Sequence, residues 1–270
     1  MFLASFRRTL PLALLSLLIA PAVAQNSLSD QIQIAPPMRQ VPPPSPTASA
    51  MELEKQGDVL RAEKHYLDAV DYYHAALEKA PQTASIYNKL GICDLMLQRF
   101  KEAGKEFERA IKDNRSFAEA FNNMGVIEYE RHKYHGAIKE YKKALTFQPD
   151  SASFYSNLGA AYFAKKDFER ATGAYTKAVQ LDPDIFDRTS HSGIAAQMAS
   201  PEDRAHYDYV LAKLYAKIGD RDHSLEFLRK SMEEGYKGVK DVYTDPEFAD
   251  LRKDSRFAEL MKSKPLAIPE

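Results

Sequence analysis

Residues 121–149 read FNNMGVIEYERHKYHGAIKEYKKALTFQP, and the spacing of small and aromatic residues in this stretch recurs every 34 residues. The repetition runs from Ala50 to Pro183. Five positions of the period keep their residue type through four blocks: Gly57, Gly91, Gly125 and Gly159; Ala69, Ala103, Ala137 and Ala171; Tyr73, Phe107, Tyr141 and Tyr175; Ala76, Ala110, Ala144 and Ala178; Tyr66, Phe100, Tyr134 and Phe168. A period of this length is typical of a solenoid of helix–turn–helix units.

Close packing of the helices in such a solenoid explains why small residues recur at fixed positions. A glycine inside a helix costs about 1 kcal/mol relative to alanine, so four glycines at one phase need a packing reason. Glycine on one helix and alanine on the next allow close approach, and the aromatic residues fill the wedge between neighbouring pairs. Pro81, Pro149 and Pro183 end the second helix in the first, third and fourth blocks, and Arg115 takes that place in the second block. No single pair buries its apolar stripe alone, so the pairs must stack.

These positions resemble the tetratricopeptide repeat family over about half of the chain. The third block shows the family pattern with Phe121, Met124, Gly125, Ala137, Tyr141, Ala144 and Pro149, and the fourth with Tyr155, Leu158, Gly159, Ala171, Tyr175, Ala178 and Pro183. Asp94 and Glu128 depart from it, since that position is often aromatic in the family. The resemblance implies an all-α, right-handed superhelical solenoid of antiparallel helix pairs, with repeats at residues 50–83, 84–117, 118–151 and 152–185.

The segments before the repeats indicate export. Arg7 and Arg8 precede an apolar run, and Ala22-Val23-Ala24 forms a small-x-small cleavage site. Residues 1–24 are therefore predicted to be a Sec-type signal peptide cleaved between Ala24 and Gln25, with a periplasmic or secreted mature chain and no stable membrane span. The alternative is an uncleaved amino-terminal anchor. Residues 25–49 are proline-rich and predict a disordered linker, or alternatively a docking segment for a partner.

The register breaks after Pro183. Residues 186–201 are predicted to be an irregular insertion, although Gly193 lies 34 residues after Gly159 and leaves a degenerate repeat open. Helical spacing of apolar residues predicts a divergent fifth repeat at 202–235. Residues 236–270 are predicted to form a helical cap, because an open repeat stack needs one; a separate binding module is the alternative.

Catalytic signatures are missing from the sequence. It contains no glycine-rich phosphate loop, nucleophile elbow, His-Glu-x-x-His or paired CxxC. His132 and His135 have metal-ligand spacing but fall at a predicted turn without a third ligand, and the single cysteine, Cys93, is expected to be a buried structural thiol. With 37 basic and 38 acidic residues, the charge gives no indication of nucleic acid binding. We therefore predict no catalytic residues, no metal and no small-molecule cofactor.

The family resemblance implies that the first helix of each pair lines a concave groove. Two rows of side chains fall at groove positions, one of amides with a lysine and one of aromatic residues: Asn88, Lys89, Asn122, Asn123 and Asn157; Tyr129 and Phe163. An amide both donates and accepts, so it can pair with the backbone of an extended peptide, and the aromatic residues could hold apolar side chains. The alternative is that the asparagines only link adjacent repeats. Glu54 and Asp58 stand where chaperone-tail-binding relatives have a lysine and an asparagine, so that partner class is not carried over.

The sequence thus predicts a non-catalytic protein–protein interaction scaffold of the bacterial cell envelope. Its partner would be a protein, bound as an extended peptide or a helix in the groove. A structural assembly factor acting through the convex face or the cap is the alternative, and a metal-dependent or sugar-acting enzyme is a remote one.

Overall fold

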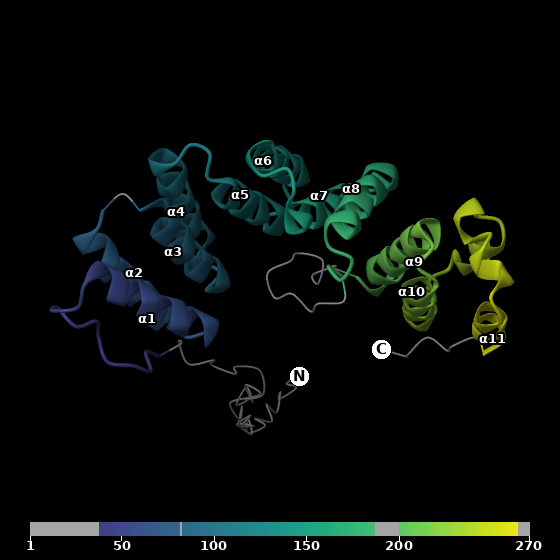
Figure 1. The fold of residues 1–270 in the computed structure, drawn as a ribbon, viewed down its shortest axis with the longest axis horizontal. Helices are drawn as coiled ribbons and strands as arrows, with labels where there is room; N and C mark the ends of the chain where they lie inside the picture. Colours follow the sequence, from purple (N-terminus) through teal and green to yellow (C-terminus); the bar gives the residue numbers. More distant parts are fainter. Residues whose placement is uncertain (1–37, 82, 187–199, 264–270) are drawn as a thin grey trace, which may run out of the picture. The chain divides into compact units, whose positions relative to one another are not determined.

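The computed structural model describes residues 38–81, 83–186 and 200–263 (Figure 1). Within these ranges the secondary structure is helical, and helices follow one another in pairs joined by short turns. The pairs are α1 (Ala50–Ala62) with α2 (Tyr66–Lys79), α3 (Ala84–Met96) with α4 (Phe100–Asp113), α5 (Ala118–Glu130) with α6 (Tyr134–Phe147), α7 (Ala152–Ala164) with α8 (Phe168–Leu181), and α9 (Pro201–Ile218) with α10 (Arg221–Glu233). The predicted fold class, an all-α solenoid of antiparallel helix pairs, is confirmed.

The glycine column packs directly against the aromatic column in the first four pairs. A Cβ atom placed at Gly57 would lie 2.7 Å from Cε1 of Tyr73, and the other three glycines meet the ring of their own repeat in the same way. These rings are fully buried, as are the alanines of both alanine columns. The 34-residue pattern therefore records the closest approach of the two helices in each pair.

The turn inside each pair depends on one residue in the left-handed region. Lys64, Gln98, His132 and Lys166 have φ angles of 65°, 59°, 58° and 61°. The following residue donates its backbone N–H to a carbonyl of the first helix, as from Lys133 to Glu128 at 2.8 Å, which closes the helix end. In the fifth pair this place is taken by Gly219, with φ 85°, and glycine adopts such an angle without a steric penalty.

The shared turn gives the register of the fifth pair. Gly219 follows Lys166 by 53 residues, whereas successive turns before it are 34 apart. In this register Ala212 replaces the column glycine and Leu228 replaces the aromatic residue. The first helix therefore gains a methyl group where the second helix carries a leucine side chain in place of an aromatic ring. Ser224 and Ser231 replace the two alanines. Their hydroxyls donate to the carbonyls of Ala212 and Ala205 across the pair, both at 2.8 Å.

The segment before α1 lies against α2, which differs from the prediction of a disordered linker for residues 25–49. Residues 25–37 are outside the described ranges, but the backbone N–H groups of Gln40 and Val41 donate to the buried carboxylate of Asp68 at 3.1–3.2 Å. Lys79 donates to the carbonyls of Pro46 and Ala48. A buried carboxylate requires hydrogen-bond donors, and this segment supplies them.

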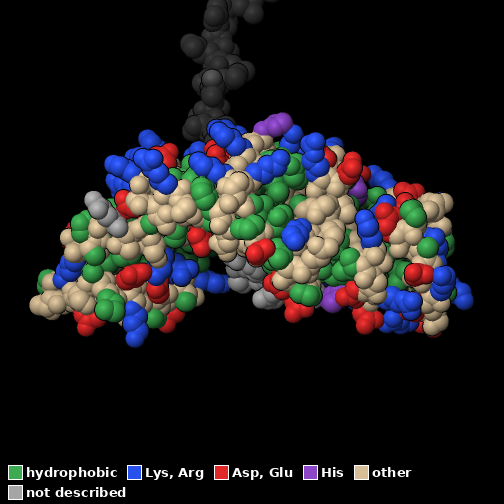
Figure 2. All heavy atoms as spheres, turned by 45° about the horizontal axis from the view of Figure 1, so that its top comes forward, with side chains coloured by type: hydrophobic (Ala, Val, Ile, Leu, Met, Phe, Trp, Pro, Cys, Tyr) green, Lys and Arg blue, Asp and Glu red, His purple; other side chains and the backbone are tan. Residues whose placement is uncertain are grey.

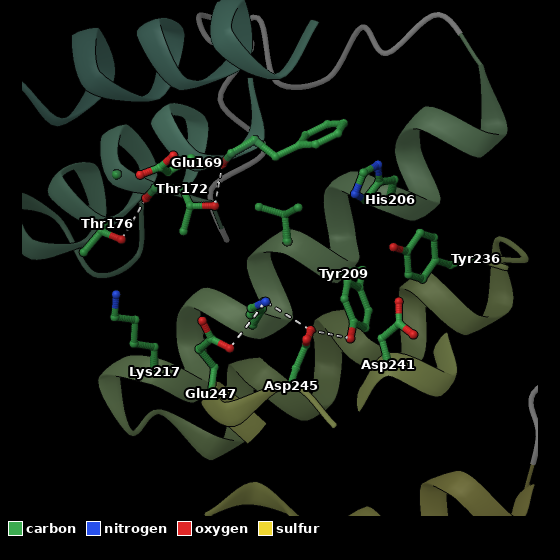
Figure 3. Close-up of a pocket in the computed structure, with 14 residues that line it drawn as sticks. Glu169, Thr172, Thr176, His206, Tyr209, Lys217, Tyr236, Asp241, Asp245 and Glu247 are labelled. Atoms are coloured by element: carbon green, nitrogen blue, oxygen red, sulfur yellow. Dashed lines mark hydrogen bonds and ion pairs between the residues drawn. The ribbon is translucent and has the colours of Figure 1, made fainter. Parts of the chain in front are cut away.

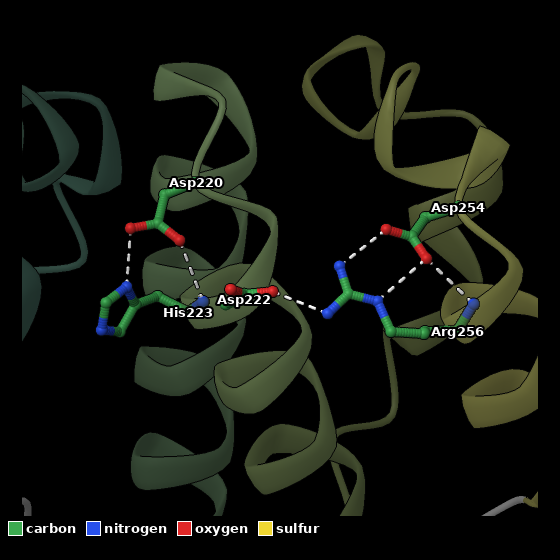
Figure 4. Close-up of polar contacts among 5 residues, drawn as sticks. All are labelled: Asp220, Asp222, His223, Asp254 and Arg256. Carbon is green, nitrogen blue, oxygen red and sulfur yellow. Dashed lines mark hydrogen bonds and ion pairs between the residues drawn. The ribbon is translucent and has the colours of Figure 1, made fainter.

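Up to residue 263, where the described part of the chain ends, the cap consists of three short 3₁₀ helices and one α-helix. These are η2 (Val239–Tyr243), η3 (Pro246–Phe248), η4 (Leu251–Lys253) and α11 (Ser255–Ser263). Phe248 and Phe257 are buried against the fifth pair. Figure 4 shows Arg256 between two carboxylates, donating to Asp254 of the cap at 2.8 Å and to Asp222 of α10 at 2.6 Å. The hydrogen bonds from Arg256 hold the pKa of Asp254 at about 2.

Several sequence predictions fall outside the described residues. They include the signal peptide at 1–24, Gly193 with most of the predicted insertion, and residues 264–270. Among the residues that are described, no helix combines the length and apolar character needed to cross a membrane.

Candidate binding surfaces

The predicted amide row is brought together by the fold, but its members bond to one another. Asn123 Nδ2 donates to Asn88 Oδ1 at 2.9 Å, and Asn157 Nδ2 donates to Asn122 Oδ1 at the same distance. Asn122 Nδ2 also donates to Asn123 Oδ1 at 3.2 Å. Asn88, Asn122 and Asn157 are buried, with exposed fractions of 7%, 8% and 2%. These bonds join repeats two, three and four, which favours the linking interpretation of the row.

Lys89 continues this pattern between the first and second repeats. Its ammonium group lies 2.7 Å from Glu54 Oε1 and 2.7 Å from Asp58 Oδ2. The Lys89–Glu54 pair has the same separation of 35 residues as the two asparagine pairs. Burial lowers the pKa of Lys89, but the hydrogen bonds to Asp58 and Glu54 outweigh burial and raise it. The lysine therefore stays charged and links α3 to α1.

The two predicted aromatic residues lie in the interior. Tyr129 is 8% exposed and its ring centroid is 5.3 Å from that of Tyr134. Phe163 is 4% exposed and contacts Phe168 and Tyr207 edge-on, at 5.2 and 5.8 Å. Both rings fill the space between a first helix and the aromatic residue that begins the second helix.

Among the side chains that stay accessible on the first helices is an apolar row in the second and third repeats. We call these residues the apolar row: Ile92, Leu95, Met96 and Val126. Met96 is 45% exposed and the others are partly buried. In Figure 2 acidic and basic side chains are interspersed over the face in view, with hydrophobic side chains between them. A partner on the first helices would therefore meet the apolar row together with polar side chains, among them the exposed Lys55 and Glu119.

A second candidate site is a pocket of about 570 Å³ between α8, α9 and the cap (Figure 3). Phe168, Glu169, Thr172, Gly173 and Thr176 face it from α8. The facing residues come from α9 and from the segment after α10: His206, Tyr209, Val210, Lys213, Lys217, Tyr236, Asp241, Asp245 and Glu247. We call this the cap pocket. Its volume lies within the range of about 300–1,000 Å³ that ligand pockets occupy.

Aromatic rings form a continuous wall of the cap pocket. The centroids of Phe168 and His206 are 4.3 Å apart, those of His206 and Tyr236 are 5.2 Å apart, and those of Tyr236 and Tyr209 are 4.6 Å apart. Burial lowers the pKa of His206, so the imidazole is neutral at pH 7. This wall is apolar and uncharged.

Polar groups line the floor. Tyr209 Oη donates to Asp245 Oδ2 at 3.0 Å, and Lys213 Nζ lies 3.1 Å from Asp245 and 3.3 Å from Glu247. Burial lowers the pKa of Lys213, but its bonds to these carboxylates outweigh burial and raise it. The hydroxyls of Thr172 and Thr176 donate to carbonyls of their own helix. The side-chain carboxylates of Glu169 and Asp241, both exposed, have no hydrogen-bond or ion-pair partner among the described residues.

The single cysteine and the two histidines with metal-ligand spacing lie outside these two candidate sites. Cys93 is fully buried, and burial raises the pKa of its thiol to about 12, which leaves it unreactive at pH 7. His132 Nδ1 bonds to Tyr134 Oη at 2.9 Å and His135 Nδ1 to Lys165 Nζ at 3.2 Å. In the part of the chain that the structure describes, no three His, Cys, Asp or Glu side chains are grouped to hold a metal ion.

Sequence reasoning missed the cap pocket, whose residues come from three elements spread from Phe168 to Glu247. One signal was available. Gly173 is an exposed glycine in the middle of α8, and a Cβ atom there would meet nothing within 4 Å. Such a glycine lacks the packing reason that explains the glycine column.

Comparison with known proteins agrees with the observed fold. Models described as tetratricopeptide repeat match residues 54–120 and 152–185, and one described as TPR repeat matches residues 126–166. Pseudomonas aeruginosa pilF is 18% identical, with 80% of this chain and 88% of that chain covered and a TM-score of 0.53. MamA from Desulfovibrio magneticus RS-1 is 18% identical over 70% and 97% of the two chains, with a TM-score of 0.49. No curated protein matches significantly.

Proposed function

Because the chain belongs to the tetratricopeptide repeat family, we propose that it is a non-catalytic scaffold that binds a protein partner, as an extended peptide or a helix, along its first helices. The observation that supports this is the apolar row. The exposed Met96 and the partly buried apolar side chains beside it, on adjacent first helices, offer a surface that a partner's apolar side chains can cover. Met96 is the most exposed of these residues.

The amides and the apolar row have different roles in this proposal, the first structural and the second in binding. Asn88, Asn122 and Asn157 are buried and hydrogen-bonded to neighbouring repeats, which supports a role in fixing the spacing of the first helices. Direct contact of these amides with partner backbone stays a prediction. The apolar row supplies the contact energy, since burying apolar surface contributes about 25 cal/mol per Å².

Site-specific photo-crosslinking in cells tests the proposal. A photoreactive phenylalanine analogue replaces Met96 in one variant and Phe147 in the other. These residues are 45% and 42% exposed, but Met96 ends a first helix and Phe147 ends a second helix. We expect a discrete protein adduct from position 96 that is several-fold stronger than from position 147. Adducts of equal strength, or an adduct from position 147 alone, would contradict binding along the first helices.

We also propose export to the periplasm or the exterior, supported by the n-region, apolar run and cleavage pattern of residues 1–24. Mass spectrometry of the full-length product made in a bacterial host with an outer membrane tests it. The expected mature chain begins at Gln25 and is found in the periplasmic or culture fraction. A product that keeps Met1 and stays with the cytoplasm would refute the proposal.

A further inference from the structure

We infer that the cap pocket binds the long basic side chain of a partner protein, a lysine or an arginine. This site is separate from the apolar row and would stand even if the first helices bound nothing. Three features of the pocket lead to the inference: its charge, its aromatic wall and the glycine that opens it (Figure 3).

The pocket carries an excess of negative charge. Glu169, Asp241, Asp245 and Glu247 contribute four carboxylates, against the ammonium groups of Lys213 and Lys217. Lys213 is already bound between Asp245 and Glu247. The carboxylates of Glu169 and Asp241, on opposite sides of the pocket, are without a partner among the described residues and remain available. A cation entering the pocket would be attracted by both.

The aromatic wall suits an alkyl chain that ends in a cation. Phe168, His206, Tyr236 and Tyr209 form an uncharged surface beside the carboxylates. Lysine and arginine bury their methylene stems along apolar surfaces while their charged ends stay near polar groups. A cation above an aromatic ring gains further attraction from the ring's quadrupole. Carboxylates beside an aromatic wall favour a basic side chain over a metal ion, because a metal ion gains nothing from contact with the apolar wall.

Gly173 makes the room for this ligand. The same position in the three preceding repeats is Asp71, Lys105 and Lys139, all with long or charged side chains. Glycine is disfavoured in a helix interior, and at position 173 a Cβ atom would meet nothing within 4 Å. The absence of a side chain on this face of α8 therefore keeps the pocket open where the repeat pattern would otherwise fill it.

The test is a titration of the protein with blocked amino acids, followed by NMR signals of His206, Tyr209 and Tyr236. The probes are N-acetyl-lysine amide and N-acetyl-arginine amide, with N-acetyl-norleucine amide as the uncharged control of similar shape and cadaverine as a free alkyl cation. For such small ligands a dissociation constant on the order of 1 mM is expected. Equal binding of norleucine and lysine amides, or no shift with either blocked cation, would overturn the inference. Binding of cadaverine without the blocked amino acids would overturn the assignment to a protein side chain.

Three variants locate the site. Gly173→Leu fills the pocket while favouring the helix, so binding should be lost and thermal unfolding preserved. Asp241→Asn should weaken binding about two- to fivefold, as loss of one exposed ion pair does. Asp250→Asn is the matched control, because Asp250 is an exposed cap carboxylate outside the pocket. Unchanged binding by a folded Gly173→Leu variant, or an equal loss in Asp250→Asn and Asp241→Asn, would contradict the site.

Discussion

The first four helix pairs and the fifth pair use different residues where the two helices of a pair come closest. In the first four, a glycine on the first helix receives the ring of a tyrosine or phenylalanine from the second. In the fifth, Ala212 faces the smaller Leu228, and two buried serines bond across the pair. The helices of a pair can thus be held together by shape or by hydrogen bonds, provided that the volume between them is conserved.

The two regions also differ in what lies between pairs. Four residues separate α2 from α3, α4 from α5 and α6 from α7, whereas nineteen separate α8 from α9. The regular junctions are joined by the bonds of Lys89, Asn123 and Asn157 to the preceding repeat. On α7, Asn157 Oδ1 is buried without a partner among the described residues. The cap pocket opens between α8, α9 and the cap. A departure from the repeat pattern therefore creates the site that the pattern itself cannot provide.

The largest effect is expected from adding a methyl group to the glycine column. Gly159→Ala would force its Cβ into the buried ring of Tyr175, and overpacking of this kind costs about 1–3 kcal/mol. The same change at Gly173, in the next helix, should instead stabilise the protein by up to about 1 kcal/mol. Urea unfolding measures both. A Gly159→Ala variant as stable as Gly173→Ala would contradict the claim that close packing requires glycine at position 159 but not at position 173.

A double variant tests whether the fourth pair can adopt the alanine–leucine packing of the fifth pair. Adding Tyr175→Leu to Gly159→Ala reproduces the pairing of Ala212 with Leu228 in the fourth repeat. The double variant should be more stable than the sum of the two single changes predicts, because the leucine vacates the space that the methyl group needs. Simple additivity would contradict the claim of conserved volume.

A smaller loss is expected from the hydroxyl bonds of the fifth pair. Ser231→Ala removes the bond to the carbonyl of Ala205 and should lower the free energy of unfolding by about 1 kcal/mol. The reverse change, Ala178→Ser, introduces a hydroxyl into the tightly packed fourth pair and should destabilise it. Calorimetry of the two variants provides the measurement. A stabilising Ser231→Ala would show that shape alone holds the fifth pair.

The smallest effect concerns pH. Burial, reinforced by Glu234, raises the pKa of Asp208 on α9 from 3.8 to about 7. The folded protein therefore favours the protonated carboxyl, and its stability falls as pH rises from about 4 to 7. Asp208→Asn should remove this slope and stabilise the protein at pH 8, with little change at pH 4. Because Asp208 is only partly buried and solvent screens its charge, the gain at pH 8 is expected to be roughly 0.5–1 kcal/mol. Denaturation at the two pH values decides, and an unchanged slope would exclude Asp208 as its source.

Sequence reasoning predicted the solenoid because its signal is repeated four times and each column has one packing role. The left-handed turn residues Lys64, Gln98, His132 and Lys166 share no residue type, so no column marked them. The amides were placed on the first helices, but their burial depends on bonds spanning 35 residues, which a 34-residue alignment separates into different columns. The fifth pair was expected, yet its register followed only from the turn at Gly219.

In the function proposed above, the buried amides join the repeats while the apolar row contacts the partner. The most direct measurement is the yield of the position-96 photo-adduct in an Asn122→Ala background, at a temperature where the variant is folded. Asn122→Ala removes the partners of the partly buried Asn123 Oδ1 and of Nδ2 of the buried Asn157, and should lower the free energy of unfolding by about 1–3 kcal/mol. We expect an unchanged adduct yield despite this loss of stability. A lost adduct with unaltered stability would show that the amides contact the partner instead.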